Sequence, residues 1–234
     1  MKIAMWSGPR NLSTAMMYAF AARGDCAVRD EPFYAPYLAA TGMDHPLSTA
    51  ILAAHDSDAA SVARHCAGPV PDGKKLFYMK HMPHHMLPGF SLDWVADCVN
   101  AHLIRHPARV IASYVEKRAE VTLHDIGFQQ QFAIWQRFPG PVLDGGDIRA
   151  NPLGMLQKLC SELGIPFVPS MLHWPAGPKP YDGAWGPHWY NAVHRSTGFA
   201  DPEGDLPAVA AQHQPLLAAA LPIYEAMRAI AINV

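Results

Sequence analysis

The chain has 234 residues, of which half are apolar and 16% are charged, and its formal net charge is −2 with neutral histidines. This length and composition predict a single packed domain over residues 1–234 and exclude long disordered segments. A net charge close to zero argues against general nucleic-acid binding, so an anion site would need a local group of basic residues.

The four cysteines are scattered along the chain and form no CxxC pair. This spacing indicates reduced core thiols rather than a disulfide framework or a zinc site. The first strand is expected from residue 2, with no leader before it, and no apolar run is long enough to span a membrane. We therefore expect a cytoplasmic protein with no membrane partner.

The stretch 2–23, KIAMWSGPRNLSTAMMYAFAAR, predicts a buried parallel strand, a tight loop and a helix. Ser13 is expected to be the N-cap of this helix, and Gly24 its C-terminal stop. A strand that enters a helix through such a loop directs free backbone N–H groups and the positive helix end at one point, which favours a phosphate or sulfate. Arg10 adds a permanent positive charge in the loop. The alternative is an ordinary strand-to-helix turn with a surface arginine.

The loop departs from the ATP-binding pattern GxxxxGK[ST]. Leu12 stands directly before Ser13, so the Gly-Lys pair that would contact the phosphates of ATP is missing. This difference argues against a Mg-ATP kinase without excluding one.

An acidic residue follows the second predicted strand, at 26–29. Pro32 ends this strand and is expected to hold Glu31 in an extended conformation. In a parallel sheet the Glu31 carboxylate would emerge at the same edge as the Arg10 loop, where such folds bind their ligands. The alternative is a solvated acidic turn.

Basic residues follow the third predicted strand, at 76–79. Lys80 and His81 come directly after it, and His84 and His85 follow in a proline-containing turn. The turn offers no clear metal-ligand geometry, because prolines separate the histidines and no carboxylate is near, so we expect no metal. A histidine at the carboxyl end of a strand is better suited to proton transfer near neutral pH.

The fourth predicted strand, 98–105, ends in Arg105, and Pro107 opens the helix that follows. Arg105 is therefore also expected at the ligand edge, the alternative being a surface salt bridge. A short fifth strand is expected at 141–143, before a loop at 144–147. Strands that alternate with helices predict an α/β fold with a central parallel sheet flanked by helices.

The remaining segments are predicted to be helices and loops that cover the sheet. Residues 34–75 are expected to form a helical cover or lid. Residues 175–200 are rich in Gly, Pro and aromatics, and a loop of this length is usually functional or disordered, so we expect an ordered cover over a site. Helices are predicted at 47–54, 57–67, 122–138, from 151 or 152 to 163, and at about 206–231.

Two stretches resemble motifs of the sulfotransferases. SGPRNLSTAM resembles the family's 5′-phosphosulfate loop, in which a basic residue precedes hydroxyl residues at the start of the first helix. LIRHPARVIASY resembles its 3′-phosphate segment, because Arg105 ends a strand and Ser113 follows eight residues later. The two motifs occur in the family's order, about ninety residues apart, and together they are more specific than either alone. The resemblance implies a three-layer sandwich like that of P-loop NTPases over essentially the whole chain.

The resemblance implies 3′-phosphoadenosine 5′-phosphosulfate (PAPS) as donor, 3′,5′-phosphoadenosine (PAP) as product, and no metal. Arg10 would stand where the family usually has a lysine that stabilises charge on the bridging oxygen; an arginine stays protonated and can act only electrostatically. The 3′-phosphate would be held by Arg105 and Ser113. The 5′-phosphosulfate would be held by the hydroxyls of Ser13 and Thr14 and by the amides of Asn11, Leu12, Ser13 and Thr14.

The resemblance offers two candidates for the base that takes the acceptor's proton. HMPHHMLP resembles the segment that carries the catalytic histidine of cytosolic sulfotransferases, with His81 as the match and Lys80 as the nearby lysine. Their spacing is one residue shorter here, which would turn the two side chains to opposite faces of a strand. DEPF resembles the carboxylate segment of carbohydrate-type and some bacterial sulfotransferases, with Glu31 as the match and no gap. We prefer Glu31 slightly, and His81 stays open.

Aromatic residues are candidates for holding the adenine, the acceptor or simply the core. Trp6 is expected in the core. The full set is Trp6, Phe33, Tyr34, Trp185 and Trp189.

The predicted function is therefore sulfuryl transfer from PAPS to a hydroxyl or amine of a small-molecule acceptor by in-line displacement. The prediction includes no nucleic-acid partner and allows a homodimer. One alternative is a P-loop small-molecule kinase, which would need Mg²⁺. Another is a nucleotide-binding protein that has lost turnover.

Overall fold

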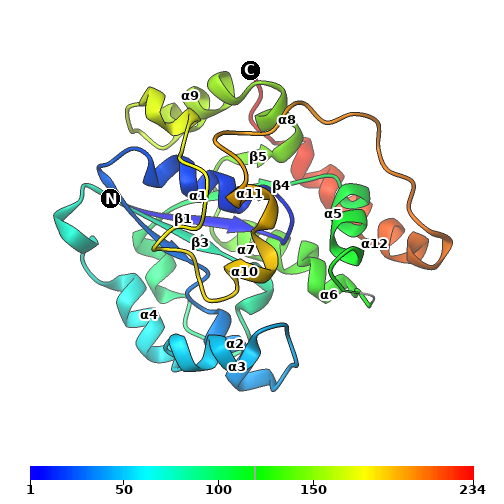
Figure 1. Ribbon diagram of the computed structural model, residues 1–234, viewed down its shortest axis with the longest axis horizontal. Helices are drawn as coiled ribbons and strands as arrows, with labels where there is room; N and C mark the ends of the chain where they lie inside the picture. The colour runs from blue at the N-terminus through cyan, green and yellow to red at the C-terminus, as the bar shows by residue number, and fades with distance from the viewer. Residues whose placement is uncertain (119) are drawn as a thin grey trace.

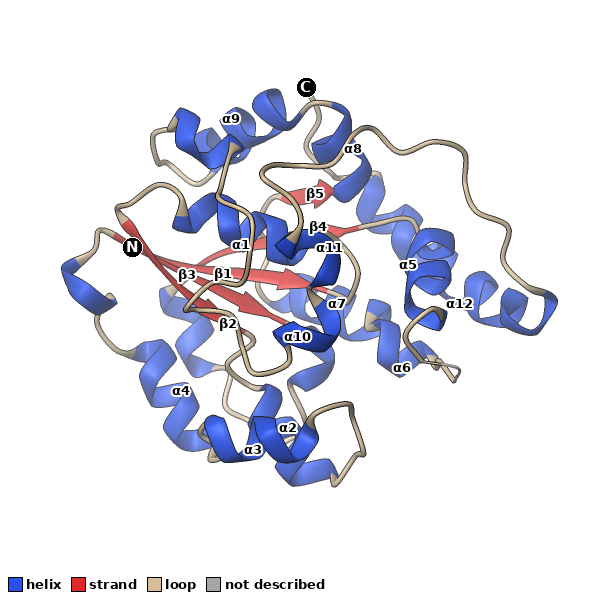
Figure 2. Cartoon of the chain, viewed as in Figure 1, coloured by secondary structure: helices blue, strands red, loops and turns tan. Residues whose placement is uncertain are grey.

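Five short strands form one parallel sheet at the centre of the computed structural model, which describes residues 1–118 and 120–234 (Figures 1 and 2). Their order across the sheet is β2-β3-β1-β4-β5, and every neighbouring pair is parallel. The predicted α/β fold with a central parallel sheet is therefore confirmed. The strands are β1 (Lys2–Ser7), β2 (Cys26–Asp30), β3 (Leu76–His81), β4 (Val99–Ile104) and β5 (Val142–Asp144).

The strand register brings the carboxyl ends to one edge of the sheet. Trp6 of β1 lies opposite His81 of β3, and Asp30 of β2 lies opposite Lys80. Successive side chains of a strand point to opposite faces. Lys80 and His81 accordingly face different helical layers, as their spacing predicts.

Helices cover both faces of the sheet, so the domain has three layers (Figure 2). α1 (Ser13–Ala21) and α9 (Pro152–Glu162) pack on one face, and α4 (Ala59–Ala67) and α7 (Phe128–Arg137) pack on the other. α12 (Gln214–Arg228) packs against α7 and α5 (Pro107–Val115). The shorter helices are α2 (Tyr34–Thr41), α3 (Ser48–Ala54), α6 (Leu123–Ile126), α8 (Gly145–Ala150), α10 (Gly186–Trp189) and α11 (Asn191–His194).

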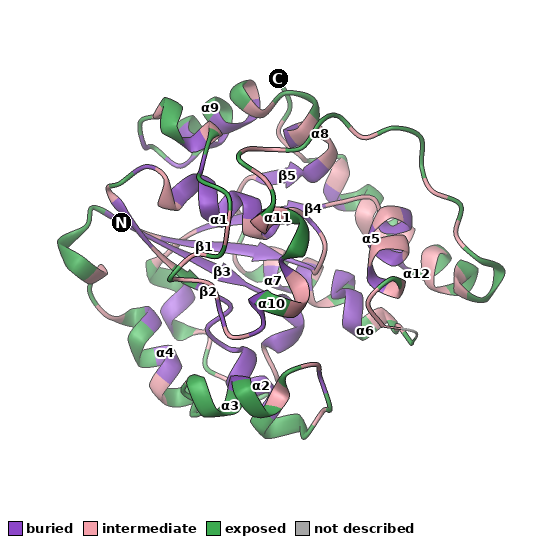
Figure 3. Cartoon of the chain, in the orientation of Figure 1, coloured by how far each residue is buried: buried purple, intermediate pink, exposed green. Residues whose placement is uncertain are grey.

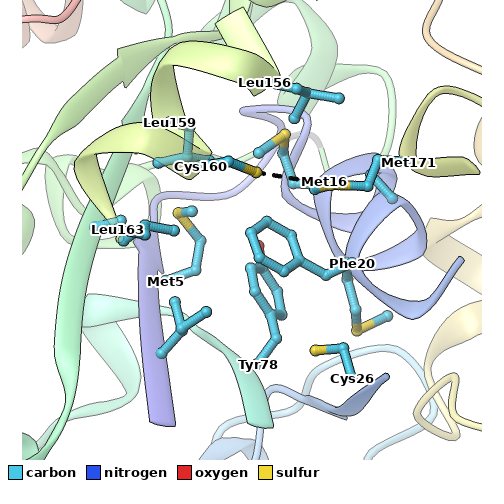
Figure 4. Close-up of a cluster of buried hydrophobic side chains, with 14 of the residues drawn as sticks. Met5, Met16, Phe20, Cys26, Tyr78, Leu156, Leu159, Cys160, Leu163 and Met171 are labelled. Carbon is cyan, nitrogen blue, oxygen red and sulfur yellow. Dashed lines mark hydrogen bonds between the residues drawn. The ribbon is translucent and has the colours of Figure 1, made fainter. Parts of the chain in front are cut away.

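Apolar packing fixes α1 against the sheet. Met16 and Phe20 of α1 meet Met5 of β1 and Tyr78 of β3 in the buried cluster of Figure 4, and all four are fully buried. The rings of Phe20 and Tyr78 stack with their centroids 4.4 Å apart. Burying an apolar side chain of this size is worth about 1.5–3 kcal/mol. The N-terminus of α1 is thereby held at the carboxyl edge of the sheet.

Several helices differ from their predicted extents. The segment 122–138 forms two helices, because Gly127 adopts φ 69° and separates α6 from α7. The C-terminal helix begins only at Gln214, and 199–210 is neither helix nor strand. The expected loop after β5 instead starts helix α8, since the Asp144 side chain accepts a hydrogen bond from the Gly146 N–H at 2.7 Å. α2 was not predicted.

Candidate active site

A cavity of about 360 Å³ lies at the carboxyl edge of the sheet. This is where open parallel sheets bind their ligands. An ordered cover over a site was expected at 175–200, and residues between 185 and 200 form part of the cavity wall. Among the predicted site residues, the lining includes Arg10, Leu12, Ser13, Thr14, Glu31, Lys80, Arg105 and Ser113.

The loop between β1 and α1 leaves the first N–H groups of the helix uncapped. Leu12, and not Ser13 as predicted, is the N-cap residue, and the helix start has no side-chain cap hydrogen bond among the described residues. Arg10 and Leu12 have φ values of 63° and 75°, in the left-handed region that favours glycine. Such alternating conformations form a concave set of N–H donors that suits an anion. Ser13 and Thr14 begin α1 in the cavity wall.

Gly8 and Asn11 fix the conformation of this loop by their contacts with other segments. A Cβ on Gly8 would lie 2.8 Å from the Ile126 carbonyl oxygen, so a larger residue cannot fit there without movement. The Asn11 side chain is buried and donates to the Leu103 carbonyl at 3.2 Å. Asn11 is therefore outside the cavity lining, and its side chain ties the loop to β4.

The two predicted donor motifs meet in the cavity. Arg10 Nε donates to Ser113 Oγ at 2.8 Å, and Arg105 Nη1 donates to the Arg10 carbonyl at 2.7 Å. Burial, and then the nearby charge of Arg105, lower the pKa of Arg10 from its ordinary value. The guanidinium of Arg10 thus lies beside Ser113, one of the two residues predicted to hold the 3′-phosphate.

Lys80 pairs directly with Glu31, one of the two base candidates. Its Nζ donates to Glu31 Oε1 at 2.7 Å and to Asp30 Oδ1 at 2.9 Å, and it lies 3.2 Å from Thr14 Oγ1. The side chain is buried, and although desolvation opposes charge, the two carboxylates raise the pKa of Lys80. Lys80 therefore links the start of α1 to the ends of β2 and β3 as a permanent charge.

Glu31 faces the cavity, but its backbone is not extended as predicted. Its φ is 36°, so the chain turns sharply at Glu31 even though Pro32 follows. The Glu31 N–H donates to the Lys80 carbonyl at 3.0 Å, which continues the β2–β3 pairing by one residue. Desolvation by burial is the main reason that the pKa of Glu31 is raised, although Lys80 opposes the shift. The second carboxylate oxygen, Oε2, lies 4.0 Å from His85 Nδ1.

His81, the other base candidate, lies outside the cavity lining. Its ring packs against Trp6 and Trp94, with both centroid distances 4.8 Å, on the opposite face of the sheet from Lys80. The side chain is buried, and burial lowers the pKa of His81 to about 3. His81 is therefore separated from the cavity by the sheet, whereas Glu31 lies in the cavity wall.

Tyr190 and Asp30 belong to this cluster and were missed in the sequence. The Tyr190 hydroxyl accepts from Lys80 Nζ at 2.6 Å and from Trp185 Nε1 at 2.7 Å, and donates to Asp30 Oδ2 at 2.8 Å. Burial and the two carboxylates raise the pKa of Tyr190 well above its ordinary value, so the hydroxyl stays protonated. Asp30 could have been identified from the sequence, because it stands directly before Glu31 at the end of a predicted strand. Tyr190 follows Lys80 by more than one hundred residues and carried no local signal.

The aromatic candidates divide between the cavity and the core. Tyr34, Trp185 and Trp189 line the cavity. Trp6 and Phe33 are buried in the cluster under α4, where Phe33 stacks on Trp94 at 5.8 Å. The core position of Trp6 agrees with its prediction.

The described residues show neither a metal cluster nor a membrane-crossing helix. Within residues 1–118 and 120–234, no three His, Cys, Asp or Glu side chains are grouped so that they could hold a metal ion. In the same part of the chain, every helix is too short or too polar to cross a bilayer. Cys26, Cys66 and Cys160 are buried free thiols, and Cys98 is half-buried.

The fold and the cavity define an α/β protein with a central parallel sheet and a cavity lined by the start of its first helix. The chain belongs to the sulfotransferase domain family, whose model matches residues 1–231. It is 36% identical over 231 residues to the branched-chain-amino-acid aminotransferase-like proteins 1 and 2 of Arabidopsis thaliana. These matches cover 97% of this chain but 41% of each relative, so the chain spans less than half of their length. A solved sulfotransferase domain from the curacin biosynthetic pathway matches with a TM-score of 0.48 and 16% identity, over 99% of this chain and 92% of that one.

Proposed function

We propose that this protein transfers a sulfuryl group from PAPS to a hydroxyl or amine of a small molecule. The observation that carries the proposal is the meeting of three groups in one cavity. These are the uncapped start of α1, the two wall residues Arg105 and Ser113, and the Lys80–Glu31 ion pair. The first two suit the two ends of a doubly phosphorylated nucleotide, and the third suits an acceptor that must lose a proton.

The donor set fits a nucleotide anion. The free N–H groups at 11–14, with the hydroxyls of Ser13 and Thr14, would hold the 5′-phosphosulfate. Arg105 and Ser113 would hold the 3′-phosphate. When bound, PAPS supplies a sulfuryl group that is activated for transfer.

Charge stabilisation would come from Lys80 and Arg10. Lys80 Nζ lies 3.2 Å from Thr14 Oγ1, which places its charge at the start of α1, where the leaving phosphate would gain negative charge. Arg10 lies in the same wall and stays protonated, so its role would be electrostatic. Carboxylates fix Lys80 and Ser113 fixes Arg10, and charges that are fixed in this way stabilise a transition state most effectively.

Glu31 would accept the acceptor's proton. Burial raises its pKa, which makes the carboxylate a stronger base than an exposed one. Lys80 engages Oε1, which leaves Oε2 for the acceptor on the side of His85. Tyr34 and Trp185 in the same wall would pack against the acceptor.

The test measures ligand-induced stabilisation and then turnover. A ligand at one hundred times its Kd stabilises the folded protein by about 2.7 kcal/mol, which corresponds to a rise in Tm of roughly 5–10 °C for a chain of this size. We expect this rise with PAP but not with ADP or Mg-ATP, and then transfer of ³⁵S from labelled PAPS to a panel of hydroxyl and amine acceptors in the presence of EDTA. A rise with Mg-ATP alone would instead indicate a kinase. Binding of PAP without transfer to any acceptor would favour the non-catalytic alternative.

A further inference from the structure

Three arginines from three elements converge on one carboxylate, that of Glu203. Arg105 Nε lies 2.9 Å from Oε1, Arg109 Nε lies 2.7 Å from Oε2, and Arg149 Nη1 lies 3.0 Å from Oε1. Arg105 follows β4, Arg109 belongs to α5 and Arg149 to α8. The Glu203 side chain is only 7% exposed. Its carboxylate is therefore almost enclosed by the guanidinium groups.

One carboxylate leaves this cluster with an excess of positive charge. Three guanidinium groups carry three charges and Glu203 neutralises one. Arg10 adds to the excess, because its charge lies close enough to Arg105 to lower its own pKa. The carboxylate of Asp147 on α8 pairs with Arg228, so it does not balance the cluster. A phosphate dianion, with twice the charge and three oxygens, matches forked guanidinium donors better than a carboxylate.

The cluster opens on the proposed donor cavity. Arg105 and Arg149 line this cavity together with Ser113, whereas Glu203 is not part of its wall. The cluster therefore lies at the end of the cavity where the 3′-phosphate would bind, and the phosphate and Glu203 would share Arg105 and Arg149 as donors.

The segment that carries Glu203 receives hydrogen bonds on its backbone from two of these arginines. Residues 199–210 form no helix or strand, and in Figures 1 and 3 they run along the outside of the molecule between α11 and α12. The Asp201 carbonyl accepts from Arg149 Nε at 2.7 Å, and the Gly204 carbonyl accepts from Arg109. Most residues from 201 to 211 are exposed, so little apolar packing would oppose their release.

We propose that Arg109 and Arg149 complete, with Arg105, the subsite that selects a donor with a 3′-phosphate, and that Glu203 is an internal carboxylate which this phosphate displaces. The proposal rests on the function proposed above. It makes Glu203 a competitor for the subsite, so the apparent affinity for PAP is lowered by the fraction of molecules in which Glu203 is bound.

The first experiment compares PAP with 5′-AMP, which lacks only the 3′-phosphate, by titration calorimetry. Glu203→Gln is expected to bind PAP about tenfold more tightly than the unchanged protein, the gain that follows if Glu203 occupies the subsite about nine-tenths of the time. Arg149→Gln is expected to weaken PAP roughly tenfold or more, because it leaves a phosphate charge without its partner. Neither change should alter the affinity for 5′-AMP. Asp205→Asn is the matched control, because Asp205 is exposed and makes no ion pair among the described residues.

The second experiment uses the unchanged protein and so does not depend on the folding of a variant. The protease Glu-C cleaves after glutamate, and cleavage after Glu203 releases a fragment that begins at Gly204. PAP should accelerate this cut, because displacement frees the segment, and 5′-AMP should not. Mass spectrometry of the fragment identifies the site.

Two sets of outcomes separate this inference from the proposed function. PAP-specific acceleration and a tighter Glu203→Gln complex support the inference even if no acceptor is ever sulfated. Protection of the 203–204 bond by PAP, or an equal change for PAP and 5′-AMP in Glu203→Gln, overturns the inference while ³⁵S transfer leaves the function standing. Failure of PAP to bind the unchanged protein overturns both.

Discussion

Lys80 and Glu31 form a buried ion pair, with Nζ 2.7 Å from Oε1, although they come from the ends of two different strands. The parallel pairing of β2 with β3 sets this contact, because Asp30 lies opposite Lys80 and Glu31 is the next residue. The sharp turn at Glu31 then brings its carboxylate into the cavity beside Lys80. Sheet register therefore places an acid and its counter-charge where the start of α1 also points.

Replacement of Glu31 by glutamine tests the base. Glu31→Gln keeps the shape but cannot take a proton, so kcat should fall about 10²–10⁴-fold, the usual contribution of a positioned base. PAP binding, followed by calorimetry, should persist. Glu162→Gln, at an exposed i,i+4 pair on α9, is the matched control. His81→Phe should retain turnover, because His81 lies outside the cavity, and the reverse pattern between Glu31→Gln and His81→Phe would restore His81 as the base.

Removal of the Lys80 charge should destabilise the fold. Lys80→Met leaves the buried Asp30 and Glu31 carboxylates without their counter-charge, and breaking a buried pair in this way typically costs about 3–5 kcal/mol. Urea unfolding measures the change in free energy. Adding Asp30→Asn and Glu31→Gln to Lys80→Met should recover part of the loss, since no uncompensated charge then remains.

Lys158→Met on α9 is the comparison for that measurement. Lys158 pairs with Glu162, but both side chains are about 40% exposed, so its loss should cost less than about 1 kcal/mol. A similar cost for Lys80→Met would mean that the buried pair contributes little to folding.

The sheet and the loop after its first strand could be predicted from the sequence because their signals are local. Apolar runs such as 3–6 and 76–79 mark strands that are buried on both faces, and the motif from Arg10 to Thr14 lies next to one of them. Spacing alone also separated Lys80 from His81. What these features share is that each depends on a few consecutive residues.

The partners across the cavity could not be predicted, because tertiary packing decides them. Tyr190 reaches Lys80 across 110 residues, and Glu203 reaches Arg105 across 98. The backbone conformations of Leu12 and Glu31 also could not be predicted, because tertiary contacts override the preferences of the local sequence. Leu12 takes the left-handed N-cap position at the start of α1, where Ser13 was the better candidate by residue type. Glu31 turns sharply at a point where the following proline favours extended backbone.

Buried neutral histidines should make stability depend on pH. Burial lowers the pKa of both His81 and His84 to about 3, whereas in the unfolded chain each titrates near 6.5. The unfolded state therefore binds more protons below about pH 6.5. The stability from this source is fully present above that pH and is lost as the pH falls toward 3, by roughly 1.4 kcal/mol per pH unit for each histidine.

Urea unfolding at pH 7.5 and pH 5.0 checks this expectation. His81→Phe keeps an aromatic ring between Trp6 and Trp94 but cannot titrate, so it should lose less stability than the unchanged protein between the two pH values. The exposed His65→Gln should change by the same amount as the unchanged protein. An identical loss in His81→Phe would show that His81 does not contribute to the acid sensitivity.

Removal of the Tyr190 hydroxyl should change catalysis through Glu31. Tyr190→Phe deletes the acceptor of hydrogen bonds from Lys80 and Trp185 and the donor to Asp30. The same O–H is shared with Glu31 Oε1, which lies 3.3 Å away, and this sharing lowers the pKa of Glu31, so without the hydroxyl that pKa should rise. The acid limb of the kcat/KM profile should then move to higher pH, since Glu31 must be ionised to act as a base. A purely structural role for Tyr190 would lower Tm and leave that limb in place.

Tyr181→Phe is the matched control for this shift. Its hydroxyl makes no hydrogen bond among residues 1–118 and 120–234, and the ring contacts Tyr18 edge-on at 5.7 Å, away from Lys80. Tyr181→Phe should therefore leave both the pH profile and kcat unchanged. If Tyr190→Phe also leaves the acid limb unmoved while PAP still binds, Glu31 is not the group that titrates in turnover, and the base must be sought elsewhere in the cavity wall, with His85 the nearest candidate because its Nδ1 lies 4.0 Å from Glu31 Oε2.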